Sequence, residues 1–114
     1  MSVNGNYAGN LDPAYHIVLA GSSAETVFTA SDSSNVAASW AFANTTGGAV
    51  TCKLIHTVGG TDFVVWQKSV PANDTEIESN LPIRLINGDI VKAVGASGVT
   101  VTVTMLAAFP FGGA

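Results

Sequence analysis

The amino-acid sequence predicts an all-β fold, a single antiparallel β-sandwich, Ig-like or jelly-roll-like, with about seven to nine short strands. Short segments rich in Val, Thr, Ile and aromatic residues are separated by Gly, Asn, Asp and Ser, as strands are separated by turns. No segment shows the apolar stripe with a period of about 3.6 residues that an amphipathic helix needs. The clearest strand is residues 99–105, Val-Thr-Val-Thr-Val-Thr-Met, which places apolar side chains on one face and threonines on the other.

Strands are also expected earlier in the chain, at residues 15–20 and 25–30. Two further segments carry alternate apolar side chains on one face, Ala38, Trp40 and Phe42 in the first and Val50, Cys52 and Leu54 in the second. Thr46-Gly47-Gly48 lies between them, and paired glycines supply the positive φ angles that tight turns require. We therefore expect these two segments to form a hairpin.

Residues 63–68 follow a second glycine turn, Gly59-Gly60, and are apolar on both faces at their centre. This pattern predicts a strand that is covered on both faces. Pro71 is expected to end the strand, because proline cannot donate to a strand ladder. Residues 74–78 then alternate acidic with other side chains, which is typical of an edge strand protected against aggregation.

Asn87-Gly88 is the strongest short hairpin signal in the chain and is expected to join strands at residues 82–86 and 89–94. The inward faces of all these strands are expected to meet in one core. That core should contain Trp40, Phe42, Cys52, Leu54, Trp66, Val101 and Val103.

The chain is expected to form one domain at residues 14–108, with an N-terminal arm at residues 1–13 and a C-terminal arm at residues 109–114. The two arms do not alternate and contain much of the Asn and Gly. Their apolar side chains suit an arm laid on a neighbouring protein. The candidate interface residues are Tyr7, Leu11, Phe109 and Phe111.

Charged residues make up 11% of the 114 residues, against about 25% in an average soluble domain. The surface must therefore carry many Thr, Ser, Asn and Ala side chains. Such a neutral, partly apolar surface is expected where much of it lies against other protein.

The net charge is −4 and the four cationic residues are far apart in the sequence, so nucleic acid is not expected as a direct partner. No apolar run approaches the ~20 residues that span a bilayer, so no membrane partner is expected. The N-terminal residues do not resemble a secretory signal, which predicts synthesis in a cytoplasm. Cys52 is the lone cysteine and cannot form an internal disulfide.

The sequence predicts no catalytic residue, no cofactor and no metal site. A serine hydrolase needs a histidine base between a nucleophile and a carboxylate, and the candidate bases are His16 and His56. We expect both histidines to be structural and partly buried. Cys52 lies in the middle of a strand between valine and leucine, where a cysteine normally acts as a small core residue.

Two other patterns allow a functional as well as a structural interpretation. Asp74, Glu76 and Glu78 share a face and could hold a hard cation, although alternating acids more often protect a short edge strand. Trp40 and Trp66 could stack on sugar rings if they were exposed and coplanar, as in a carbohydrate-binding module. Their apolar neighbours favour the core.

Three turn-like segments follow one another along the chain. They are residues 43–51 (Ala-Asn-Thr-Thr-Gly-Gly-Ala-Val-Thr), 70–75 (Val-Pro-Ala-Asn-Asp-Thr) and 87–93 (Asn-Gly-Asp-Ile-Val-Lys-Ala). In this order they resemble turns of small β-sandwich virion structural proteins of tailed bacteriophages, of the decoration, neck or tail type. The resemblance covers residues 26–105. These motifs specify turns and strand edges and carry no catalytic residue across, and both ends of the chain depart from the family pattern.

The resemblance implies a non-enzymatic structural component of a phage particle, made in the host cytoplasm and located in the virion. A capsid decoration (cement) protein is the leading expectation, because such proteins are short single domains that stabilise the head by protein–protein contacts. Its partners would be the major capsid protein, other virion proteins and copies of itself in a homo-oligomer. A tail, neck or fibre-base protein and a carbohydrate-binding module are the alternatives.

Overall fold

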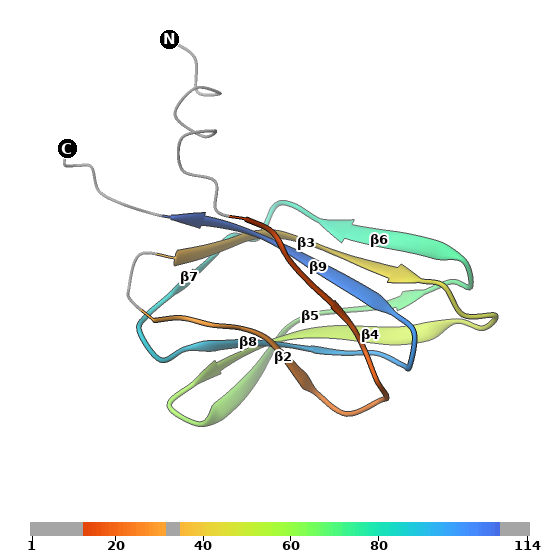
Figure 1. The fold of residues 1–114 in the computed structure, drawn as a ribbon, viewed down its shortest axis with the longest axis horizontal. Helices are drawn as coiled ribbons and strands as arrows, with labels where there is room; N and C mark the ends of the chain where they lie inside the picture. Colours follow the sequence, from red (N-terminus) through yellow and green to blue (C-terminus); the bar gives the residue numbers. More distant parts are fainter. Residues whose placement is uncertain (1–12, 32–34, 108–114) are drawn as a thin grey trace, which may run out of the picture.

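The computed structural model describes residues 13–31 and 35–107, which form two antiparallel sheets packed as two layers (Figure 1). The strands are β1 (Tyr15–Val18), β2 (Glu25–Thr29), β3 (Asn35–Asn44), β4 (Val50–Val58), β5 (Thr61–Val70), β6 (Asp74–Glu78), β7 (Ile83–Leu85), β8 (Ile90–Val94) and β9 (Thr100–Ala107). The first sheet, sheet A, has the order β1-β9-β3-β6, and β7 also pairs with β3. Sheet B has the order β2-β8-β4-β5. The all-β sandwich predicted from the sequence is confirmed.

Strand β9 shows how the alternating sequence determines the layers. Val99, Val101, Val103 and Met105 are all 0% exposed, whereas the threonines between them are partly exposed. Because successive side chains of a strand point to opposite faces, one face of β9 lies against sheet B and the other against solvent.

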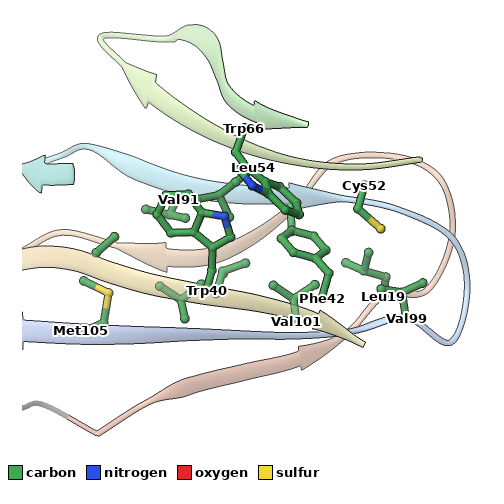
Figure 2. Packing of buried hydrophobic residues seen from close by; sticks show 14 of the residues in the cluster. Leu19, Trp40, Phe42, Cys52, Leu54, Trp66, Val91, Val99, Val101 and Met105 are labelled. Atoms are coloured by element: carbon green, nitrogen blue, oxygen red, sulfur yellow. The ribbon is translucent and has the colours of Figure 1, made fainter. Parts of the chain in front are cut away.

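The core lies between the two sheets and contains the two tryptophans. Trp40 and Phe42 extend from β3 toward Trp66 and Leu54 of sheet B (Figure 2). The rings of Phe42 and Trp66 are stacked with centroids 4.9 Å apart, and Trp40 meets Trp66 edge-on at 6.4 Å. The predicted core residues Trp40, Phe42, Cys52, Leu54, Trp66, Val101 and Val103 all belong to this single cluster.

The two hairpins expected at Thr46-Gly47-Gly48 and at Asn87-Gly88 are wrong, because both segments cross between the sheets. The first joins β3 in sheet A to β4 in sheet B, and the second joins β7 in sheet A to β8 in sheet B. The described glycines with positive φ are Gly59, Gly60, Gly88 and Gly98, so Gly47 and Gly48 do not have the expected conformation. Alternation identifies the buried face of a strand, but both sheets bury a face in the same core.

The expectation that residues 63–68 are covered on both faces is also wrong. They belong to β5, the edge strand of sheet B, and the side chains of Phe63 and Val64 are 52% and 53% exposed. The Gly59-Gly60 turn does join β4 and β5 as a hairpin, and the strand ends before Pro71 as predicted. A register shift between the pairs Leu54–Trp66 and Ile55–Val64 leaves Val65 as an extra residue in β5. Such a bulge twists an edge strand and reduces its pairing with other strands.

Strand β6 is an edge strand of sheet A, as its alternating acids predict. Lys68 of β5 and Glu76 of β6 form an ion pair of 3.7 Å between Nζ and Oε1. The pair bridges the edges of the two sheets on one side of the sandwich.

Candidate interaction surface

The four interface residues predicted from the sequence, Tyr7, Leu11, Phe109 and Phe111, lie outside the described residues. The described surface nevertheless carries large exposed apolar side chains. These are Tyr15, Val18, Val58, Phe63, Val64, Ile77, Leu81 and Ile86. Val18 and Ile77 are the most exposed of them, at 64% and 68%, and lie on opposite edge strands of sheet A.

The solvent-facing side of sheet A joins these two edges. The strand register places His16, Thr102, Ala41 and Ile77 in one row across β1, β9, β3 and β6, and Val18, Thr100, Ala43 and Thr75 in the next. Thr104 and Ser39 pair beside them. Each of these side chains is partly or fully exposed, whereas their sequence neighbours Trp40, Phe42, Val101 and Val103 are in the core. We call this set of ten residues the charge-free face, because no Asp, Glu, Lys or Arg of the described chain belongs to it. Arg84 of β7 also lies on the outward side of sheet A, beyond the charge-free face, because it is exposed, pairs with Val36 of β3 and lies on the face opposite to the core residue Leu85.

The solvent-facing side of sheet B differs because it carries charges of both signs. The register places Lys53, Asp62 and Lys92 on the face opposite to the core residue Leu54. Asp62 accepts a 2.6 Å hydrogen bond from the Thr57 hydroxyl and pairs with Lys92 at 3.2 Å. The Thr57 hydrogen bond, followed by Lys92, lowers the pKa of Asp62. The two broad faces of the sandwich are therefore chemically distinct.

Both histidines have structural contacts. His56 Nε2 lies 2.8 Å from Asp89 Oδ2, and the same carboxylate oxygen accepts the Ile86 N–H at 3.0 Å. His56 is half-buried as predicted, and its pairing with Asp89 fastens the β7–β8 turn to β4. His16 is exposed instead, with Nδ1 2.9 Å from the Thr102 hydroxyl on the charge-free face.

Asp89 should make the stability of the domain depend on pH. The pKa of this carboxyl is lowered, first by the Ile86 N–H and then by His56. A lowered folded-state pKa contributes stability above the unfolded value of about 3.9, and the contribution is lost as pH falls through the folded value. We therefore expect Asp89→Asn to be less stable than wild type at pH 7 and nearly equal to it at pH 2.

Urea denaturation of both proteins across this pH range measures the difference. Asp74→Asn, which makes the same charge change at an exposed position of β6, is the matched control. An Asp89→Asn defect that stays constant from pH 7 to pH 2 would contradict the proposed role of the carboxylate charge.

The remaining candidate groups lie in structural positions. Cys52 is 0% exposed, and burial raises the pKa of its thiol. Within residues 13–31 and 35–107, no group of three or more His, Cys, Asp or Glu side chains is placed to hold a metal ion. The same residues contain no helix long and apolar enough to cross a membrane.

The sequence alone did not reveal the charge-free face or the role of Asp89. The threonine row of β9 was visible in the sequence, but its alignment with uncharged residues of three other strands depends on the sheet order. Asp89 follows the Asn-Gly turn signal directly, and aspartates often accept hydrogen bonds from turn amides. The position of Asp89 directly after this turn is the signal that could have identified it.

Comparison with known proteins found no matching family model and no matching curated protein. The similar solved structures include two that are each described as a pentameric capsid protein isolated from metagenomic phage sequences. One has a TM-score of 0.45 and 16% identity over 82% of this chain and 60% of its own chain. The other has a TM-score of 0.45 and 14% identity over 94% of this chain and 76% of its own.

Proposed function

We propose that this chain is a non-enzymatic structural component of a phage particle, a capsid decoration protein that stabilises the head by protein–protein contacts. The observation that carries the proposal is the charge-free face, in a chain with only 11% charged residues. A surface without ions can be buried against protein without the cost of desolvating unpaired charges. The placement on a phage particle follows from the sequence resemblance over residues 26–105.

No observation on the described residues favours the carbohydrate-binding alternative. Stacking on sugar rings requires exposed tryptophan faces, whereas Trp40 is 1% and Trp66 is 8% exposed. Their rings also meet at 81°, so they do not form a common plane. A position in the tail, neck or fibre base remains the competing assignment within the structural class, and the experiment below distinguishes it from the head.

The terminal arms would add to attachment in this proposal. The proposed contact residues of the arms are Tyr7, Leu11, Phe109 and Phe111. Burial of one aromatic side chain contributes about 1.5–3 kcal/mol to the binding free energy. Ordering a flexible segment costs about 1–2 kcal/mol per residue, so the arms can assist a domain that is already held by its surface but cannot replace it.

The test uses particles of the phage that encodes the chain, prepared with and without this gene. Immunogold labelling of complete particles should place the protein on the head rather than the tail.

Purified full-length protein should co-sediment with the deficient heads. A chain lacking residues 1–11 and 109–114 should bind at least about tenfold more weakly while keeping its melting temperature within a few degrees. Label confined to the tail would contradict the decoration role, and absence of label from the particle would contradict a virion role. Equal binding of the truncated chain would contradict the role of the arms.

A further inference from the structure

We propose that the charge-free face of sheet A binds the same face of a second copy of this chain, with the two sheets packed face to face about a two-fold axis. This inference deepens the proposed structural function and rests on it, because it names the partner and the surface of one of the contacts. The central row of the face contains Thr102, Ala41 and Ile77.

The charge of the chain restricts which partners this face can contact. The chain carries a net charge of −4, so two copies repel each other unless their contact excludes most of the acidic side chains. The charge-free face meets this condition, and the cation Arg84 of β7 lies beyond it on sheet A. The outward side of sheet B instead presents Lys53, Asp62 and Lys92. A partner with a charged surface would lose hydration on this face without gaining an ion pair. The partner surface must therefore also be neutral, and the same face of another copy is neutral.

The threonine hydroxyl groups of the face suit a contact with a second copy. Thr100, Thr102 and Thr104 present a row of hydroxyl groups at the centre of the face. A hydroxyl group both donates and accepts a hydrogen bond, so a row of threonines is complementary to an identical row. A carboxylate or an ammonium group lacks this property, because each acts only as an acceptor or only as a donor. A two-fold contact, which brings identical surfaces together, is satisfied by this chemistry.

The area of the face sets the strength of the contact. Strands about 4.8 Å apart that rise about 3.3 Å per residue give this face, four strands wide and about five residues long, a footprint of about 300 Å². Two such faces bury about 600 Å² in total, which is below the range of about 1,200–2,000 Å² for stable specific interfaces. The structure thus predicts a weak dimer in dilute solution that is strengthened when many copies are held close together in an assembly.

Sedimentation equilibrium of the full-length chain, from about 10 µM to about 1 mM, tests the proposal. Wild type should show a reversible monomer–dimer equilibrium. Thr102→Lys should raise the dissociation constant at least about tenfold, because a two-fold contact brings two added cations into one interface. Thr51→Lys makes the same change at an exposed position on the outward side of sheet B and should leave the constant unchanged.

A second pair of variants guards against misfolding. Ile77 and Val64 are 68% and 53% exposed, so Ile77→Lys and Val64→Lys should both fold, as circular dichroism and thermal melting will show. Ile77→Lys should weaken the dimer and Val64→Lys should not. A monomeric wild type at 1 mM, or equal effects of the sheet A and sheet B variants, would overturn the inference. If the protein labels the head but stays monomeric in solution, this inference is overturned and the proposed function stands. If the protein dimerises but does not label the particle, the proposed virion role is wrong.

Discussion

Trp66→Ala is expected to lower the unfolding free energy by about 3–5 kcal/mol, the range measured when a large buried aromatic side chain is removed. Trp66 lies on the edge strand β5, yet its side chain is 8% exposed because it turns inward over β3. It stacks on Phe42 at 4.9 Å and contacts the edge of Trp40 at 6.4 Å between ring centroids. Its removal would take away the aromatic contacts and leave a cavity between the two sheets.

Urea denaturation followed by circular dichroism measures this loss, with Phe63→Ala as the matched control. Phe63 belongs to the same strand but is 52% exposed, so its replacement should cost less than about 1 kcal/mol. A Trp66→Ala loss below about 1 kcal/mol would contradict the buried position of the indole and would restore the sugar-binding interpretation.

Asn44→Ala is expected to cost about 2–4 kcal/mol, because several buried groups lose their hydrogen-bond partner together. Asn44 is 1% exposed at the end of β3. Its Nδ2 donates to the carbonyls of Gly48, Val70 and Pro71 at 2.8, 3.0 and 3.2 Å. Its Oδ1 accepts the N–H and the hydroxyl of Thr46 at 2.9 and 2.6 Å. One side chain thus holds the β3–β4 crossing against the end of β5.

Asn44→Asp provides the sharper test, because it keeps the acceptor and replaces the donor with an oxygen that faces three carbonyls. We expect it to be at least as destabilising as Asn44→Ala at pH 7. Asn80→Ala, at an exposed position after β6, is the control and should change the unfolding free energy by no more than about 0.5 kcal/mol. Denaturant titration of all the variants provides the comparison, and an Asn44→Asp protein as stable as wild type would show that the donated hydrogen bonds contribute little.

The sequence by itself determined where the strands lie and, for the strands that alternate, which face is buried. The alternation of Val101 and Val103 with threonines predicted the orientation of β9, and the alternation around Trp40, Phe42 and Leu54 predicted members of the core. These predictions succeed because the period of two along a strand is a local property of the chain. The edge position of β6 was also predictable from a local pattern, because its alternating acidic side chains protect an edge strand against pairing.

The tertiary structure alone decided which strands are neighbours. The same alternating pattern fits a hairpin or a crossing between sheets, so the turns at Gly47-Gly48 and Asn87-Gly88 could not be distinguished from hairpins by their residues. The exposure of Phe63 and Val64 follows from the edge position of β5 and not from their apolar character.

The candidate surface depended on tertiary structure to a greater degree. The charge-free face combines side chains from four strands, and His16 and Thr102 of its central row are 86 residues apart in the sequence. Asn44 likewise reaches Val70, 26 residues away. A sequence pattern records the burial of each strand, whereas the sheet order determines which side chains come together. The chemistry of a surface is therefore decided only by long-range pairing.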